Sequence, residues 1–344
     1  MSADAREELL RVEHLNKTFE VHGGPFSRRI KLRALQDISF SLRSGETLGI
    51  VGESGCGKST LGRCILQLLK PDDGKVLWLG RDLVPLQGEE MRMVRRDLQI
   101  IFQDPLASLN PRMTIGEIIA EPLRSLRSDV PASERQSRVL DMLKGVGLQP
   151  EMINRYPHEF SGGQAQRIGI ARALITGPKL IVCDEPVSAL DVSIQAQILN
   201  LLSEIKERLG LSLIFISHNL SVARHVSDRV MVLYLGRIME LASGDELYSD
   251  PKHPYTKALL TAVPVPDPKR ARLLNIDALK GEIPSPINPP SGCTFRTRCR
   301  YATARCAEIR PPLESAGGDR QVACIRWQEI DAAPGMEAAA ESLV

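Results

Sequence analysis

The stretch "GESGCGKS" at residues 52–59 decides the fold of this 344-residue chain. It follows a short apolar run, "TLGIV" (47–51), and opens a helical pattern, "GKSTLGRCILQLLK" (57–70). This is the phosphate loop G-x-x-x-x-G-K-[ST] in its strand–loop–helix context. The glycines let backbone N–H groups surround a phosphate, helped by the helix N-terminus. We expect Lys58 to neutralise charge on the β- and γ-phosphates and Ser59 to bind Mg²⁺. The alternative is a glycine-rich turn with a surface lysine.

The composition narrows the class of protein. With 43% hydrophobic and 25% charged residues, the chain suits one large globular domain plus an extension, or two domains. The net charge of +2 gives no argument for a nucleic-acid partner. The charged N-terminus lacks the apolar centre of a signal peptide. No apolar run approaches the roughly 20 residues that span a bilayer. We therefore expect a cytosolic chain, in which structural disulfides are disfavoured.

Two further apolar runs end at residues that can carry chemistry. "LIVC" (180–183) leads into Asp-Glu-Pro, and "LSLIFIS" (211–217) leads into a histidine. Such runs fit central strands of a parallel sheet, buried on both faces. The pattern at 193–210 places its apolar residues on one helix face, and Gly210 can cap the end. Strands alternating with helices predict an α/β fold.

The remaining segments predict additional subdomains. Residues 32–50 alternate as antiparallel strands do, and "PDDGKVLWLG" (71–80) reads as a turn and a strand. Residues 104–170 look mainly helical. Prolines cluster at 263–269 and 281–292, which predicts a separate, loop-rich C-terminal region.

Two carboxylates follow the strand at 180–183. A strand tip beside a phosphate loop is where a Mg²⁺-binding aspartate belongs, which favours Asp184. Glu185 can then orient and deprotonate the attacking water. By itself, Asp-Glu after a strand is often an ordinary turn. Together with a phosphate loop, the same pair indicates a site for Mg²⁺ and the attacking water.

A second glycine-rich turn, "FSGGQAQR" (160–167), leads into another helix. Ser161, Gly162 and Gly163 leave N–H groups free at the helix start, which predicts a second anion site. The alternative is a capping box, with Ser161 as the N-cap and Gln164 three residues later.

The motifs "GESGCGKST", "IIFQDP", "FSGGQAQR", "LIVCDEP", "SALD" and "ISHNL", in this order, resemble the nucleotide-binding subunit of ABC transporters over about residues 9–262. The resemblance implies a P-loop NTPase core with an antiparallel β subdomain, a helical subdomain at about 104–170 and a small loop-rich C-terminal region. It also implies a head-to-tail dimer, with each ATP between one phosphate loop and the partner's Ser161–Gln164 segment.

The same resemblance assigns individual roles. Gln103 would sense Mg²⁺ and the membrane subunits, Asp191 would contact the dimer partner, and His218 would contact the γ-phosphate. Phe19 would stack on adenine, with a core phenylalanine as the alternative. Catalysis would rest on Glu185, His218 and Gln103, and Mg²⁺ on Ser59, Gln103 and Asp184. The ATP-binding residues would be Phe19, Gly52, Glu53, Ser54, Gly55, Cys56, Gly57, Lys58, Ser59 and Thr60.

Three other segments, "FQDPLASLNPRMTIGE" (102–117), "HPYTKALL" (253–260) and "GEIPSPINPPSGCTFRTRC" (281–299), resemble the oligopeptide/dipeptide importer branch, and its F-type subunit more than its D-type. The resemblance implies a second, D-type ATPase subunit, two membrane permease subunits and an extracytoplasmic binding protein as partners. The chain would lie peripherally on the cytoplasmic face of the membrane. Related importers carry nickel, glutathione or opines.

Four cysteines follow the spacing Cys293-x5-Cys299-x6-Cys306-x17-Cys324. This spacing matches neither common zinc modules nor ferredoxins, so it leaves a metal site, disulfides or unrelated thiols open. The importer branch implies a [4Fe–4S] cluster, with zinc as the alternative. Because these cysteines lie outside every ATP motif, we expect a structural or redox-sensing role. We also expect nearby arginines to lower the thiol pKa values, namely Arg296, Arg298, Arg300 and Arg305.

The sequence therefore predicts an ATP-hydrolysing subunit that powers import of di- or oligopeptides by dimer closure and reopening. Its domains would be an ATPase domain at 1–262, a four-cysteine region at 263–330 and a loose tail at 331–344. The alternatives are a soluble ABC ATPase in a non-transport role, an importer of another cargo, or a non-hydrolysing ATP-binding regulator.

Overall fold

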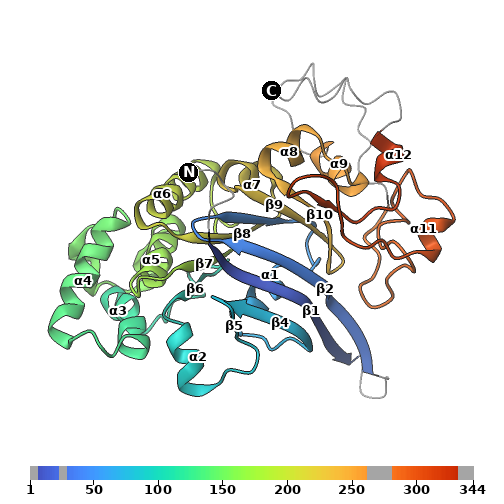
Figure 1. Cartoon of the computed structure of the whole chain (residues 1–344). Helices are drawn as coiled ribbons and strands as arrows, with labels where there is room; N and C mark the ends of the chain where they lie inside the picture. Colours follow the sequence, from blue (N-terminus) through green and yellow to red (C-terminus); the bar gives the residue numbers. More distant parts are fainter. Residues whose placement is uncertain (1–6, 23–28, 262–280, 332–344) are drawn as a thin grey trace.

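The computed structural model describes residues 7–22, 29–261 and 281–331 (Figure 1). The predicted domain boundary at 262–263, the proline cluster at 263–269 and residues 332–344 of the predicted tail lie outside this range. None of the helices in the described ranges combines the length and the apolar character that a bilayer span requires.

A mixed sheet of eight strands forms the centre, in the order β11-β12-β10-β9-β3-β8-β7-β6. The five consecutive strands from β9 to β6 run parallel. Every residue of three of them is buried, because both faces of the sheet are covered. The strands predicted from apolar runs are thereby confirmed. The parallel strands are β3 (Thr47–Val51), β6 (Leu98–Ile101), β7 (Leu180–Asp184), β8 (Ser212–Ser217) and β9 (Arg229–Tyr234), and β10 (Arg237–Ser243) pairs antiparallel with β9.

The helices beside these strands follow the predicted pattern with one difference. Helix α6 (Val192–Leu209) ends at Gly210, whose φ of 63° is the left-handed cap expected there. Helix α1 (Lys58–Ile65) is shorter than the predicted 57–70, because Gln67 turns the chain with a φ of 53°. Helix α7 (Leu220–Val226) follows β8.

A second sheet, antiparallel and of four strands, packs over α1 in the order β2-β1-β4-β5. Leu61 and Ile65 of α1 share one buried core with Leu15 and Ile38 of this sheet and Ile50 of β3. This is the predicted antiparallel subdomain, and it holds α1 against the main sheet. Its strands are β1 (Glu8–His22), β2 (Arg29–Arg43), β4 (Asp73–Trp78) and β5 (Arg81–Asp82).

The predicted helical subdomain occupies one end of the molecule (Figure 1). Its helices share a core of aliphatic side chains that extends to the main sheet. Helix α3 begins with a capping box between Thr114 and Glu117. The helices here are α3 (Ile115–Leu126), α4 (Ala132–Gly145), η2 (Pro150–Asn154), η3 (Pro157–Glu159) and α5 (Gly162–Leu174), while α2 (Gly88–Val94) precedes β6.

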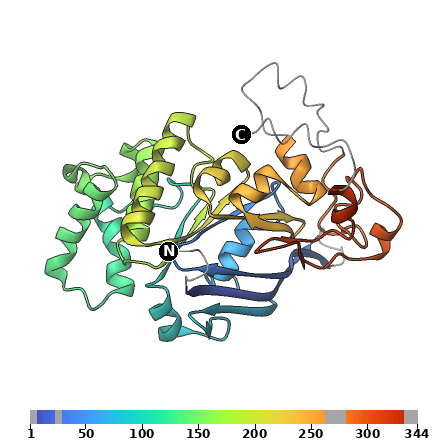
Figure 2. The same cartoon turned by 45° about the horizontal axis from the view of Figure 1, so that its top comes forward.

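The C-terminal region is rich in loops, as predicted, but it does not stand apart from the core. Strand β12 pairs with β10, so that Glu240 faces Val322 in the main sheet. Phe295 is almost fully buried in a core shared with Tyr255. The region lies at the end opposite the helical subdomain (Figures 1 and 2). Its elements, with the two helices before it, are α8 (Gly244–Ser249), α9 (Pro254–Thr261), α11 (Arg305–Glu308), β11 (Glu314–Ser315), β12 (Gln321–Val322) and α12 (Trp327–Asp331).

Candidate functional site

The loop at residues 52–59 joins β3 to α1 and curls back on itself. Gly57 has a φ of 107°, and a Cβ there would lie 2.5 Å from the Ala34 carbonyl oxygen, so only glycine fits. The buried Lys58 Nζ donates to the carbonyl oxygens of Gly52 at 2.8 Å and Glu53 at 3.1 Å. The Lys58 side chain therefore lies across the hollow of the loop, where a phosphate would bind. Ser54 and Gly55 lie exposed at the rim, and Thr60 lies in the first turn of α1.

Ser59 and Asp184 meet at the end of this loop. The Ser59 Oγ donates to Asp184 Oδ1 at 2.6 Å, across 125 residues of sequence. Burial raises the pKa of Asp184, and the Ser59 hydrogen bond opposes that shift. A hydroxyl and a carboxylate side by side supply the hard oxygen ligands that Mg²⁺ prefers, so these two predicted ligands fit the ion.

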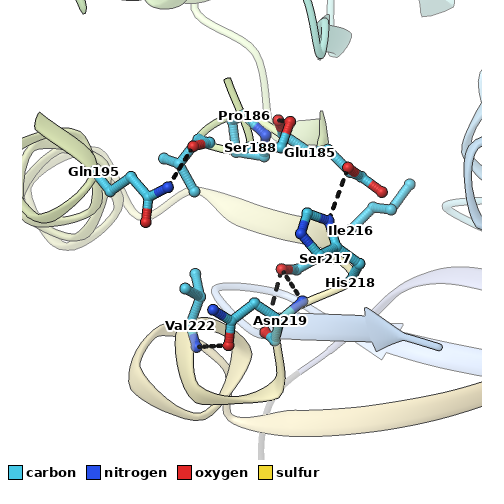
Figure 3. Close-up of a pocket in the computed structure, with 10 residues that line it drawn as sticks. Glu185, Pro186, Ser188, Gln195, Ile216, Ser217, His218, Asn219 and Val222 are labelled. Carbon is cyan, nitrogen blue, oxygen red and sulfur yellow. Dashed lines mark hydrogen bonds and ion pairs between the residues drawn. The ribbon is translucent and has the colours of Figure 1, made fainter. Parts of the chain in front are cut away.

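Glu185, His218 and Gln103 also come together. His218 Nδ1 lies 3.0 Å from Glu185 Oε2, and the Gln103 amide donates to the same oxygen at 3.3 Å. Figure 3 shows His218 turned toward Glu185 at the rim of a pocket between the ends of β7 and β8. Gln103, the third predicted Mg²⁺ ligand, is hydrogen-bonded to Glu185, whereas the other two, Ser59 and Asp184, are bonded to each other.

Local backbone structure fixes two of these side chains. Glu185 adopts a φ of 47°, a left-handed conformation that costs energy in a residue other than glycine. Its N–H donates to the Ile216 carbonyl oxygen at 3.1 Å, which ties the tip of β7 to β8. After His218, the Asn219 side chain accepts from the N–H groups of Ser221 and Val222 and starts α7.

The Ser161–Gln164 segment forms the capping box named as the alternative. Ser161 Oγ accepts from the Gln164 N–H at 3.4 Å, and Gln164 Oε1 accepts from the Ser161 N–H at 3.1 Å. Among the described residues, none of the hydrogen bonds of Ser161 or Gln164 reaches the phosphate loop. Gly162 and Gly163 pack against Leu190 and Ile194. Within one chain, this segment and the phosphate loop are thus two separate places.

Asp191 lies exposed to solvent, and Phe19 is partly exposed. Asp191 precedes α6 without capping it through its side chain, and the next residue, Val192, is 82% exposed. The Phe19 ring, on β1, is half-buried and has Lys17 Nζ 5.7 Å from its centroid. The alternative reading of Phe19 as a core residue therefore does not fit.

The four C-terminal cysteines line one pocket. Apolar residues, including Phe295 and Ile330, supply much of the rest of its wall. All four thiols are free. As the described part of the chain stands, it has no group of three or more histidine, cysteine, aspartate or glutamate residues arranged to hold a metal ion. The structure thus gathers the cysteines Cys293, Cys299, Cys306 and Cys324 without drawing them into a metal geometry.

The expectation that neighbouring arginines lower the thiol pKa values is wrong. Burial raises the pKa of Cys293, and it raises the pKa values of Cys299 and Cys324 to about 11. The apolar wall disfavours the thiolate more than positive charge favours it. The arginine side chains whose charge lowers the pKa values of Cys293 and Cys299 are those of Arg237 and Arg326, which are not among the four predicted from the sequence. Of the predicted four, Arg296 acts on Cys293 through its backbone N–H.

Two residues that the motifs did not identify contact the phosphate loop. The Arg298 guanidinium forms an ion pair with the Glu53 carboxylate, and the Tyr255 hydroxyl accepts from the Glu53 N–H. Arg298 appeared in the sequence only as one of several arginines near the cysteines. Tyr255 lies in "HPYTKALL", which pointed to a branch of the family but to no contact.

Two family models match the chain. One is described as "ABC transporter" and matches residues 35–188. The other is described as "Oligopeptide/dipeptide transporter, C-terminal region" and matches residues 239–306. The second match includes Cys293, Cys299 and Cys306.

Curated relatives and solved structures agree with these models. The oligopeptide transport ATP-binding protein OppF of Haemophilus influenzae is 57% identical over 93% of this chain and 98% of its own length. OppF of Escherichia coli is 58% identical over 91% of this chain and 95% of its own. A dimeric ATP-binding cassette, MJ0796, in a post-hydrolysis state with ADP and phosphate, superposes with a TM-score of 0.61 at 31% identity. It covers 68% of this chain and 98% of its own.

Proposed function

We propose a function on the basis of the family, since the chain belongs to the ATP-binding subunits of oligopeptide ABC transporters. It is an ATPase whose hydrolysis of ATP powers the import of peptides. The observation that carries the proposal is the meeting of Glu185, His218 and Gln103 beside the Ser59–Asp184 pair. A loop that only bound nucleotide would not need a carboxylate held by two further side chains.

The residues divide the chemistry among them. Lys58 and the N–H groups of the phosphate loop bind the phosphates. Ser59 and Asp184 hold Mg²⁺, which when bound neutralises charge on the β- and γ-phosphates. Glu185 orients the attacking water and accepts its proton, and His218 contacts the γ-phosphate. Phe19 stacks on the adenine. The Gln103 amide, which bonds Glu185 in this structure, links the site to the segment that follows it.

Each ATP lies between two subunits. Among the described residues, no hydrogen bond of Ser161 or Gln164 reaches the phosphate loop of the same chain, so the segment is available to the partner's nucleotide. Its N–H groups at the start of α5 suit the γ-phosphate. Asp191 and the exposed Val192 lie beside it and contact the partner. ATP binding closes this dimer, and hydrolysis with product release reopens it.

The partners are a second, D-type ATPase subunit, two membrane permeases and an extracytoplasmic binding protein. The chain lies peripherally on the cytoplasmic face of the membrane. The helical subdomain receives the permeases, because the loop after Gln103 leads directly into it and carries Leu106, which is 44% exposed. A change in the nucleotide site reaches the permeases through Gln103.

The four cysteines hold a [4Fe–4S] cluster, with zinc as the second candidate. Support comes from their convergence on one largely apolar pocket. A buried thiol with a raised pKa is a poor thiolate by itself, whereas bound metal keeps it deprotonated. Thiolate ligands suit both iron–sulfur clusters and zinc.

Reconstitution tests the function. The chain, its partner ATPase and the two permeases are assembled in vesicles with the binding protein on the opposite side. ATP hydrolysis should rise when the binding protein carries an oligopeptide, and labelled peptide should accumulate. Hydrolysis that ignores peptide but responds to nickel, glutathione or an opine would reassign the cargo. Absence of ATP hydrolysis in the assembled complex would refute the ATPase itself.

A further inference from the structure

The phosphate loop is held from outside by the C-terminal region. The Arg298 guanidinium faces the Glu53 carboxylate with its two terminal nitrogens, Nη1 at 2.6 Å from Oε2 and Nη2 at 3.0 Å from Oε1. The two residues lie 245 positions apart in the sequence. The Arg298 side chain is only 4% exposed and that of Glu53 is 21% exposed. A bidentate, largely buried pair of this kind is among the stronger polar contacts in proteins.

Glu53 is tied at its backbone as well. Its N–H donates to the Tyr255 hydroxyl at 3.1 Å, and its carbonyl oxygen accepts from Lys58 Nζ at 3.1 Å. Tyr255, in α9, is fully buried. The carboxylate, the N–H and the carbonyl of one loop residue are therefore all engaged, two of them by residues outside the ATPase motifs.

An aromatic cluster makes this support stiff. Tyr234, Tyr255 and Phe295 pack with ring centroids 4.7 to 5.4 Å apart. Arg298 lies over the Tyr234 ring, 5.9 Å from its centroid. The hydrophobic core that contains these rings also includes Val51, the last residue before the loop, and Cys293 and Cys299 pack against this core. A shift of the 293–299 segment must then move either the arginine or the aromatic core beneath the loop.

The charges of the Arg298–Glu53 pair affect how well the loop binds the phosphates of a nucleotide. Glu53 belongs to the loop that receives the phosphates, and an unpaired carboxylate there would repel them. Arg298 cancels that charge and fixes where the carboxylate points. Lys58 stays free to leave the loop carbonyls for a phosphate.

We propose that Arg298 is a positioning residue for the phosphate loop, through which the cysteine-bearing C-terminal region sets the affinity for nucleotide. It acts through Glu53 and touches no reacting atom. The proposal rests on the proposed function, since it concerns the affinity of a nucleotide site. It gives the C-terminal region a role in the ATP cycle that its distance from the motifs in sequence did not suggest.

The test is a double-mutant cycle on the full chain, with the dissociation constant of a fluorescent ADP analogue and Mg²⁺ as the readout. Arg298→Gln should weaken binding by about tenfold, because it leaves the Glu53 carboxylate unpaired. Arg298→Lys keeps the charge without the fork and should lose less. The double variant Glu53→Gln with Arg298→Gln should recover most of the loss, because the repelling charge is gone. Arg296→Gln, which removes an arginine bonded to Ser291, is the matched control and should bind like the wild type.

A second readout separates positioning from mere structural support. Coupling between two sites is reciprocal, so bound nucleotide should slow hydrogen exchange in residues 291–306 of the wild type and not of Arg298→Gln. Equal affinities of wild type and Arg298→Gln, or an additive cycle, would overturn the proposal. If Arg298→Gln does not fold, Arg298→Lys and the double variant carry the comparison. A wild type that binds no nucleotide would refute the proposed function instead.

Discussion

The His218 imidazole lies 3.0 Å from Glu185 Oε2, although 33 residues separate the two in the sequence. They meet because β7 and β8 are parallel neighbours, so that the residues after each strand emerge at the same edge of the sheet. The Gln103 amide reaches the same oxygen from the end of β6. The carboxylate is thereby held by two side chains in an orientation fixed before any water arrives.

Glu185→Gln should slow ATP turnover by about 10²-fold or more, because the amide cannot accept the proton of the attacking water. ATP binding should persist, since the phosphate loop is unchanged, and the closed dimer should accumulate. Turnover is measured in the assembled transporter and dimer formation by size-exclusion chromatography with ATP. Near-normal turnover in this variant would contradict the assignment of Glu185 as the base.

Lys58→Ala should weaken nucleotide binding itself by at least about tenfold, because it removes a charged contact to the phosphates made in the ground state. Titration with a fluorescent ADP analogue measures the effect. Lys179→Ala is the control, since its exposed side chain lies 3.5 Å from Asp97 and away from the loop. Equal losses in both variants would mean that Lys58 has no specific role.

Ser161→Asp separates the two roles of this residue. Aspartate is as good an N-cap as serine, so α5 and the free energy of unfolding should be little changed. A carboxylate facing the partner's γ-phosphate should nevertheless abolish the ATP-dependent dimer, while each chain still binds ADP. Urea unfolding, ADP titration and chromatography with ATP report the three quantities. A normal ATP dimer in this variant would argue against the shared site.

Protein purified without oxygen should be brown, with broad absorbance at roughly 400 nm from the iron–sulfur centre. Serine at Cys293, Cys299, Cys306 or Cys324 should bleach it, whereas serine at Cys64, which is buried in α1, should not. Colourless protein with about one zinc per chain would replace the cluster by zinc. Metal-free protein with four titratable thiols in the pocket would exclude both.

Gly57→Ala should destabilise the fold more than Gly55→Ala. Both positions have positive φ, which costs an L-residue about 1–2 kcal/mol. Only at position 57 would the new Cβ also meet a backbone atom, the Ala34 carbonyl oxygen, whereas position 55 is open. Urea denaturation gives the two free energies of unfolding, and equal losses would show that β2 yields to the added methyl group.

Much of the central fold could be predicted because it obeys simple patterns. Apolar runs of the right length identified β3, β7 and β8, and the residues at their ends pointed to the candidate site. Asp184, Glu185 and His218 were predictable for a topological reason, since the carboxyl ends of parallel strands share one edge. The glycine at position 210 likewise marked the end of α6.

Other features of the fold could not be predicted, because they leave no recognisable pattern in the sequence. Strands β11 and β12 have two residues each, too few for any periodicity to show. The early end of α1 depends on a positive φ at Gln67, and glutamine is not a residue type from which a positive φ would be predicted. The partnership of Arg298 with Glu53 depends on tertiary packing across 245 residues, and a sequence rich in arginine offers many equally plausible candidates.

The pairing of β12 with β10 has a consequence for the solubility of the ATPase core. Without β12, the backbone of Glu240 and Leu241 would form an open sheet margin. Such margins recruit strands from other molecules and seed aggregation. The C-terminal region closes that margin with two short strands. A chain truncated before the C-terminal region would therefore expose this edge of the sheet and self-associate more readily. The ATPase core and the C-terminal region thus cannot be separated without exposing a strand edge.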